Sequence, residues 1–157
     1  MTKNSSTDKQ GDREITTTRI FDAPRELVFK MWTDPKYIVQ WWGPNGFTIT
    51  IYEMDVRPGG VWQFVMHGPD GTDYKNKFIY DEIVMPERIA YSHVSGPQFR
   101  AIVTFDDQDS KTKVTVWMTF ESAEERDNVV KKYGAIEGLN QTLGRLEQQL
   151  AKMLKVG

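Results

Sequence analysis

The sequence predicts an α+β domain in which a curved antiparallel sheet of about seven strands wraps around a long C-terminal helix. Two patterns favour this fold. Between Phe47 and Glu121, apolar residues tend to recur at every second position in six runs separated by short turns, which is typical of antiparallel strands. Between Val129 and Met153, apolar residues recur at spacings of three and four, which is typical of one helical face. The sheet face and the helix stripe are expected to bury each other.

The first elements of the chain are expected to be a strand and two short helices. Residues Glu14 to Phe21 are rich in Thr and Ile and should form the first strand. A helix should begin at Asp22-Ala23-Pro24, because proline is tolerated in the first turn and an acidic residue is favourable there. Thr33-Asp34-Pro35 should end that helix and begin the next one, with Asp34 as its N-cap.

Six more strands and the final helix are expected to follow. Ser122 and Glu125 form a capping box, so the helix should run as one element from there to about Leu154. Residues 1–13 are polar and are expected to be a disordered lead-in, whereas residues 14–157 should form a single domain. The predicted strands are Phe47 to Val56, Gly60 to His67, Tyr74 to Val84, Arg88 to His93, Phe99 to Phe105 and Lys113 to Glu121.

Charge and composition narrow the classes of partner. The chain has 20 basic and 22 acidic residues, and its net charge of −2 gives no electrostatic reason to expect nucleic acid or an anionic membrane. It contains no cysteine, which excludes disulfides and thiolate ligands and fits a reducing compartment. No apolar run approaches the roughly 20 residues of a membrane span. We therefore expect a cytoplasmic protein, either a monomer or a homodimer.

The two histidines do not predict a metal site. Alternation in the second long strand places Trp62 and Phe64 on the inward face and His67 on the other face. His93 shares a face with Tyr91 and can reach the interior. Because a metal needs at least a third ligand and convergence, we expect no metal and no cofactor.

Aromatic residues dominate the expected interior. They fall at inward positions of the strands and on the two short helices, and a curved sheet cannot pack all of them against one helix without leaving a space. We expect that space to bind a small apolar molecule. The candidate ligand-binding residues are Trp32, Trp41, Trp62, Phe64, Phe78, Tyr80, Tyr91, His93, Phe99, Tyr133, Leu139 and Leu143.

Several short motifs, taken together and in order, carry a family resemblance over about residues 14–154. They are Phe21-Asp22-Ala23-Pro24, Trp32-Thr33-Asp34-Pro35, Trp41-Trp42-Gly43-Pro44, Asp55-Val56-Arg57-Pro58-Gly59-Gly60, Asp70-Gly71, Pro86-Glu87-Arg88-Ile89 and Glu137-Gly138-Leu139. With them the chain resembles the helix-grip superfamily, also called START-like, SRPBCC or birch-pollen-allergen-like. Within it, the chain is similar to the C-terminal part of the activator of the heat-shock-protein-ninety ATPase. Many members carry Gly-Trp where this chain has Gly138-Leu139.

The resemblance implies the fold and leaves three functions open. The first is a non-enzymatic binding module with a hydrophobic cavity, co-chaperone-like or stress-related, whose partner could include a chaperone or another protein. The second is a small cyclase, dehydratase or hydrolase using His93 and Tyr80 with Glu82 or Asp55 as acid–base groups. The third is a dimerising interaction domain with a filled interior. No nucleophile elbow or zinc-protease motif is present to decide among them.

Overall fold

The computed structural model describes residues 13–156, with side chains up to residue 154. The expected lead-in therefore lies outside the described residues, apart from Arg13. None of the described helices is long and apolar enough to cross a membrane. The elements are β1 (Glu14–Phe21), α1 (Arg25–Thr33), α2 (Pro35–Ile38), β2 (Thr48–Met54), β3 (Val61–His67), β4 (Asp73–Val84), β5 (Arg88–His93), β6 (Phe99–Gln108), β7 (Lys111–Phe120), α3 (Ala123–Tyr133) and α4 (Ala135–Val156).

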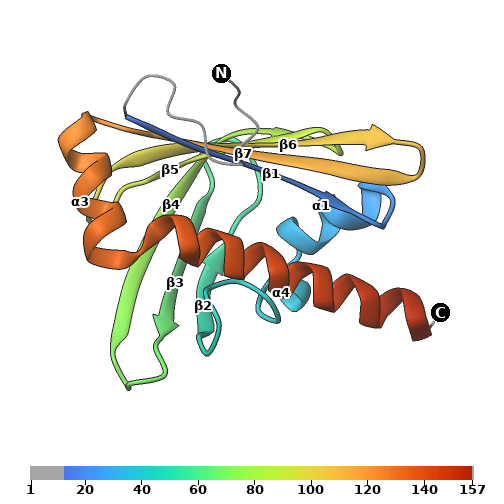
Figure 1. Ribbon diagram of the computed structural model, residues 1–157, viewed down its shortest axis with the longest axis horizontal. Coiled ribbons are helices and arrows are strands. Elements are labelled where there is room, and N and C mark those ends of the chain that lie inside the picture. Colours follow the sequence, from blue (N-terminus) through green and yellow to red (C-terminus); the bar gives the residue numbers. More distant parts are fainter. Residues whose placement is uncertain (1–12, 157) are drawn as a thin grey trace.

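The strands form one antiparallel sheet in the order β1-β7-β6-β5-β4-β3-β2. The first strand pairs with the last, so Glu14 lies opposite Thr119 and the chain leaves the sheet next to where it entered. Register shifts between Ile51 and Glu53 in β2 and between Tyr80 and Glu82 in β4 mark irregularities of the bulge kind, which bend a strand. Figure 1 shows the bent sheet with α4 running across it. The predicted α+β fold with a seven-stranded curved sheet is confirmed.

The strand ends differ from the prediction where turns are tight. β1 and β5 have the predicted bounds, and β2 is shorter than predicted. The β6–β7 ladder continues to the pair Gln108 and Lys111, where a loop had been expected. Asp109 and Ser110 form the turn with φ of 53° and 73°, and positive φ at both central residues is the pattern of the type I′ two-residue hairpin turn.

The final helix is not continuous, which corrects the single element expected from Ser122 to Leu154. The predicted N-cap is present, since the Ser122 hydroxyl accepts a hydrogen bond from the Glu125 N–H at 3.1 Å. However, Gly134 adopts a left-handed conformation with φ of 59° and ends α3. Glycine takes this conformation without the steric penalty that a Cβ brings. The chain therefore changes direction, and α4 runs across the sheet at an angle to α3 (Figure 1).

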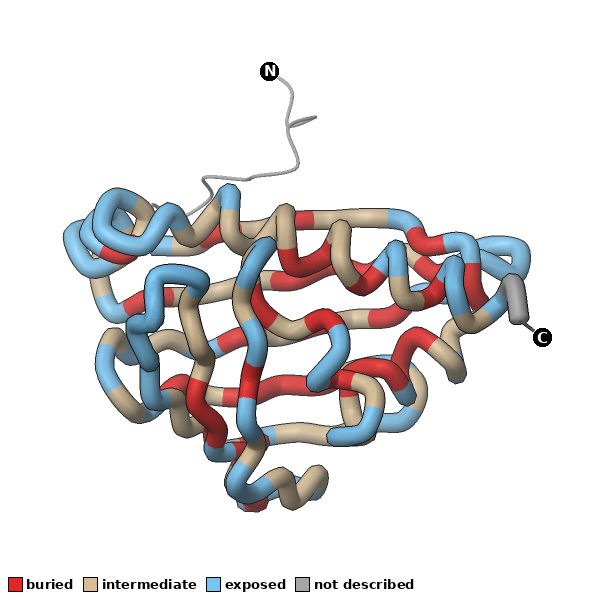
Figure 2. Tube along the Cα trace, turned by 90° about the horizontal axis from the view of Figure 1, so that it is seen from below, coloured by how far each residue is buried: buried red, intermediate tan, exposed pale blue. Residues whose placement is uncertain are grey.

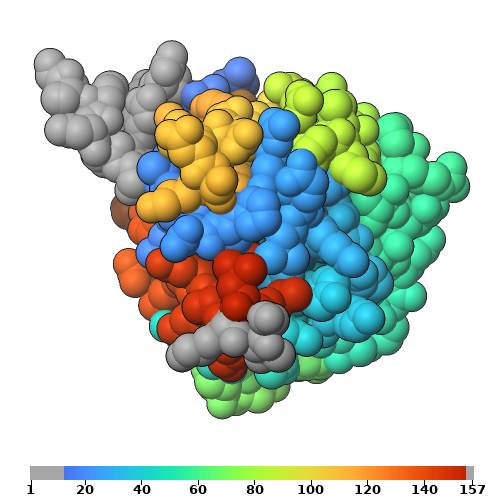
Figure 3. All heavy atoms as spheres, turned by 90° about the vertical axis from the view of Figure 1, so that its right-hand side faces the viewer, coloured from blue at the N-terminus to red at the C-terminus, as the bar shows by residue number. Residues whose placement is uncertain are grey.

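The core lies between α4, α1 and the sheet. Leu143, Leu146 and Leu150 recur at spacings of three and four, and all are buried in one apolar cluster with strand residues such as Val103 and Phe105. Figure 2 shows that the buried residues gather along the middle of the strands, while the loops are mostly exposed. The C-terminal part of α4 lies beside α1 (Figure 3).

Candidate functional site

A cavity of about 250 Å³ lies between α4, the sheet and the loop that follows α2. We call it the inner cavity. No charged side chain among residues 13–154 lines it. Its wall is formed by Trp32, Trp42, Gly43, Pro44, Phe64, Met66, Asn76, Phe78, Tyr91, Phe99, Ala101, Val116, Met118, Tyr133, Ala135, Gly138, Leu139, Thr142 and Leu143.

The structure brings most of the candidate residues to this wall. Phe64, Phe78, Tyr91 and Phe99 come from four neighbouring strands, and Trp32 comes from α1. From the helical side come Tyr133, Leu139 and Leu143. Tyr133 ends α3 and is half exposed, so it stands at the edge of the cavity rather than inside it.

Three of the candidate aromatic residues pack elsewhere in the core. Trp41 is fully buried, and its indole N–H donates to the carbonyl of Met31 at 3.1 Å. Trp62 points to the same face of the sheet as Phe64, but the ring of Trp42 packs edge-on against it. The two ring centroids are 4.9 Å apart. The ring of Tyr80 stacks on that of Trp62 with a centroid distance of 6.3 Å, and Tyr80 does not line the cavity. Strand alternation gives the face of a side chain and not its depth, which is why Trp62 and Tyr80 were included. Trp41 was included from the apolar side of the second short helix, where the sequence does not show which of two adjacent tryptophans faces the cavity.

Several wall residues were not among the candidate ligand-binding residues, and cross-strand register explains why one of them, Ala101, matters. Tyr91 of β5 lies directly opposite Ala101 of β6, and Ala101 lies opposite Met118 of β7. Ala101 is therefore a small side chain between two large ones, and the space that it leaves belongs to the cavity. Of the adjacent pair Trp41 and Trp42, it is Trp42 that lines the wall. Alternation within β6 gives Ala101 the same inward face as Phe99, but only register and packing show that it leaves a space there.

Burial keeps the two phenols of this region neutral. Desolvation raises the pKa of Tyr80 far above its usual value, and the nearby Tyr91 raises it further. Desolvation also raises the pKa of Tyr91, while the Trp32 indole opposes part of this effect. The indole N–H is near the phenol but does not meet an acceptor in hydrogen-bond geometry. The inner cavity thus offers neutral polar atoms and no charge.

A second hollow of about 510 Å³ adjoins the inner cavity, and we call it the vestibule. It shares Pro44, Met66, Asn76, Phe99 and Tyr133 with the inner cavity. The residues that it adds are mostly polar or small. They are Phe47, Tyr74, Lys75, His93, Ser95, Gly96, Pro97, Val129 and Lys132.

His93 lines the vestibule and not the inner cavity. Its Nδ1–H donates to the carbonyl of Pro97 at 2.7 Å, and its Nε2 lies 2.8 Å from the side-chain amide of Asn76. The imidazole also stacks on Phe99 at 4.9 Å. Desolvation lowers the pKa of His93, and the bond to Pro97 opposes this in part. His93 is therefore a buried, oriented imidazole at the boundary between the two hollows.

Arg145 holds α4 against the loop that closes the inner cavity. Its Nη1 lies 3.4, 2.9 and 3.0 Å from the carbonyl oxygens of Trp42, Gly43 and Pro44. Burial lowers the pKa of Arg145. Gln141, one turn earlier on the helix, accepts a hydrogen bond from the Asn45 N–H at 3.0 Å. These polar contacts fix the wall residues of the loop relative to those of the helix.

The carboxylates proposed for acid–base chemistry are engaged with other groups. Asp55 pairs with Arg57 at 2.7 Å, and Glu82 pairs with Arg88 at 2.7 Å. Asp81, which directly precedes Glu82 and is a further strand carboxylate, accepts a hydrogen bond from the Ser92 hydroxyl at 2.7 Å and pairs with Arg100. None of the three carboxylates lines the inner cavity or the vestibule.

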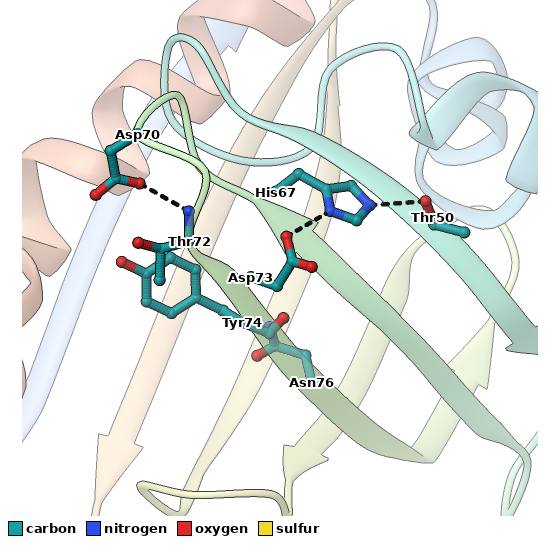
Figure 4. Close-up of polar contacts among 7 residues, drawn as sticks. All are labelled: Thr50, His67, Asp70, Thr72, Asp73, Tyr74 and Asn76. Carbon is teal, nitrogen blue, oxygen red and sulfur yellow. Dashed lines mark hydrogen bonds and ion pairs between the residues drawn. The ribbon is translucent and has the colours of Figure 1, made fainter.

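A second polar constellation lies at the β2, β3 and β4 end of the sheet (Figure 4). The Nε2 of His67 is 2.8 Å from the Thr50 hydroxyl, and its Nδ1 is 2.8 Å from a carboxylate oxygen of Asp73. This order of hydroxyl, imidazole and carboxylate matches that of an activated nucleophile. However, all three residues are substantially exposed, and none lines the inner cavity or the vestibule. We therefore interpret the constellation as a set of cross-strand contacts.

In the turn beside this constellation, the Asp70 side chain is hydrogen-bonded to the backbone of the same turn. Asp70 accepts a hydrogen bond from the Thr72 N–H at 3.0 Å, and this bond lowers the pKa of the Asp70 carboxyl.

Among residues 13–156, no group of three or more His, Asp or Glu side chains is arranged to hold a metal ion.

Comparison with known proteins connects this architecture to one family. The family model described as "Activator of Hsp90 ATPase homolog 1-like protein" matches residues 22–151. No functionally curated protein matches the chain.

Solved structures share the fold over almost the whole chain. A Mycobacterium smegmatis protein is 26% identical with a TM-score of 0.83, and the match covers 94% of this chain and 96% of that one. An Arthrobacter aurescens protein is 23% identical with a TM-score of 0.86, covering 92% and 89%. A Nitrosomonas europaea protein is 22% identical with a TM-score of 0.82, covering 92% and 97%.

Proposed function

Since the chain belongs to the Activator of Hsp90 ATPase homolog 1-like family, we propose that it acts as a non-enzymatic binding module whose inner cavity takes one small apolar molecule. The observation that carries the proposal is the wall itself. Aromatic and aliphatic side chains surround about 250 Å³ of space, and no charged side chain faces it. A space with such walls is poorly hydrated and receptive to an apolar ligand.

The size of the space limits the ligand. Pockets that hold drug-sized molecules usually measure about 300–1,000 Å³. The inner cavity lies below that range, which favours a body of one or two fused rings or a short aliphatic chain. The Trp32 indole N–H and the Tyr91 hydroxyl are the polar atoms that would orient such a body.

Intrinsic tryptophan fluorescence tests the proposal, because Trp32 and Trp42 lie on the wall. We expect saturable quenching by an environment-sensitive apolar dye. Ala101→Phe should abolish the quenching, because the new ring would occupy the cavity. The absence of any saturable change in folded wild-type protein would overturn the proposal.

A milder pair of variants keeps the test valid if Ala101→Phe does not fold. Gly138→Ala adds a methyl group to the cavity wall, with its Cβ 3.4 Å from Pro44. Gly144→Ala adds the same group on the same helix, away from the wall and 3.4 Å from Arg19. Both variants gain helix propensity of about 1 kcal/mol. Weaker dye binding in Gly138→Ala and unchanged binding in Gly144→Ala would support the proposal.

The family description favours a second candidate function, which is docking on a chaperone ATPase. It names relatives of an ATPase activator. This function would use the outer surface in the reducing cytoplasm, a location that suits a chain without cysteine. Stimulation of ATP hydrolysis by the purified chaperone, retained in Ala101→Phe, would favour docking over ligand binding as the main role.

A further inference from the structure

The vestibule carries positive charge in a protein whose net charge is slightly negative. Lys75 and Lys132 line it, and no Asp or Glu within the described part of the chain does. The chain as a whole has a net charge of −2. The nearby Glu125 lines a neighbouring hollow together with Lys131 and Lys132 and is not part of the vestibule. The local charge therefore differs in sign from the charge of the whole molecule.

Lys132 is placed at the boundary with the inner cavity. Its ammonium lies 5.3 Å from the ring centroid of Tyr133, and Tyr133 lines both hollows. The Asn76 side chain lies at the same boundary, where its NH2 group donates to the Tyr74 carbonyl at 3.2 Å and keeps a second N–H for a ligand. A molecule whose body fills the inner cavity would thus leave its outer end beside a cation and an amide.

Helix stability offers a different reason for a lysine at this position. Lys131 and Lys132 both lie in the last turn of α3, where a cation interacts favourably with the helix dipole. That effect is the same for both residues. Of Lys131 and Lys132, only Lys132 lines the vestibule, so comparison of the two residues separates a ligand contact from the dipole effect.

We propose that the ligand is an amphipathic monocarboxylate whose apolar body occupies the inner cavity and whose carboxylate lies in the vestibule beside Lys132. This inference rests on the proposed function and adds the chemical class of the ligand. A carboxylate suits the site better than a phosphate, because one ammonium and one amide at the boundary are fewer donors than a group with nearly two negative charges and three strong acceptor oxygens needs. The ammonium and the Asn76 amide together match one singly charged, planar head group.

Isothermal titration with a matched pair of probes tests the inference. The probes are 2-naphthoate and its neutral amide, 2-naphthamide, which share the same ring body. We expect naphthoate to bind wild-type protein roughly three- to tenfold more tightly than naphthamide, the size of one charge-assisted contact at a partly exposed site. This preference should shrink as salt is added, because the contact is screened.

The variants Lys132→Met and Lys131→Met locate the carboxylate. In Lys132→Met the preference for naphthoate should fall to about one, whereas Lys131→Met should keep most of it. Equal losses in both variants would mean that only the overall charge matters, and this would overturn the placement of the head group. Equal binding of both probes to wild-type protein would overturn the inference but leave the apolar site intact. If neither probe binds and the apolar dye also fails, the proposed function fails as well.

Discussion

Ala101 determines at the residue scale whether the interior is filled. It is the smallest of the sheet residues on the cavity wall, and its cross-strand neighbours Tyr91 and Met118 are large. Folded interiors are close-packed, so a space of this kind forgoes van der Waals contacts and lowers stability. The space beside Ala101 therefore supports the ligand binding proposed above.

Leu143 and Leu146 provide a matched test of the wall. Both are almost completely buried, but only Leu143 lines the inner cavity. We expect either substitution by alanine to lower the free energy of unfolding by about 2–5 kcal/mol, measured by urea denaturation. Leu143→Ala should also change dye affinity, whereas Leu146→Ala should not. A loss below about 0.5 kcal/mol at both positions would contradict the assignment of this face to the core.

His93 predicts a loss of stability in mild acid. Burial lowers its pKa in the folded protein relative to the unfolded chain, where the value is about 6.5. In the interval between the two pKa values, the unfolded state binds more protons, so protonation favours unfolding. The contribution of neutral His93 to the free energy of unfolding is fully present above about pH 6.5. It decreases as the pH falls toward the pKa of His93 in the folded protein.

Thermal melts measured between pH 7.5 and 5.5 test this prediction against the variant His93→Gln. The other ionisable groups are common to both proteins, so the difference between the two slopes isolates His93. The melting temperature of wild-type protein should fall more steeply than that of His93→Gln. Parallel slopes would contradict the burial of a neutral imidazole.

Arg145 acts at the scale of elements, because it fastens α4 to the loop after α2. In Arg145→Met, the carbonyls of Trp42, Gly43 and Pro44 lose their shared donor, and we expect a loss of about 1–3 kcal/mol in unfolding free energy. The control is Arg100→Met, since Arg100 makes only an exposed contact with Asp81 and should change stability by less than about 0.5 kcal/mol. Chemical denaturation measures both. Equal losses would mean that the Arg145 contacts do not fasten the loop.

Sequence patterns predicted the elements better than their junctions. β1 and β5 were predicted at their observed bounds, because alternation and flanking turn residues mark both strands clearly. The break at Gly134 was not predicted, since a glycine inside a helix costs only about 1 kcal/mol and the apolar stripe continues on both sides. Whether such a glycine adopts a left-handed conformation depends on the direction that the next helix must take across the sheet.

For the site as well, features that depend on neighbouring residues in the sequence were predicted better than features that depend on distant contacts. Phe64 and Phe78 could be assigned to the wall from their strand parity alone. Trp62 has the same parity as Phe64, but Trp42 covers it from a loop distant in sequence. The contribution of Ala101 depends on the registers of three strands. Residues on the wall are therefore selected by long-range packing, which one sequence does not reveal.

At the scale of the whole molecule, we expect no response to divalent metal ions. No group of metal-ligating side chains converges among residues 13–156, and the chain has no cysteine. The melting temperature should therefore be the same with sub-millimolar zinc, with calcium and with a chelator, as measured by scanning fluorimetry. A shift of several degrees with zinc would indicate a site that binding assembles.

The shared core of sheet and helix predicts that the molecule unfolds as one unit. Leu143, Leu146 and Leu150 of α4 belong to the same buried cluster as Trp62 and Phe105, so the helix and the sheet cannot lose their packing independently. Far-ultraviolet circular dichroism follows mainly the helices, and tryptophan fluorescence follows the aromatic cluster.

We expect the two signals to give the same midpoint and the same slope in urea, as a two-state transition requires. An apolar dye at about a hundred times its dissociation constant should then raise the stability by about 2.7 kcal/mol and move both transitions together. Separate midpoints, with helix signal lost before fluorescence, would contradict a common core. They would instead describe α4 as an element that detaches from a folded sheet, and the inner cavity would then open by local unfolding.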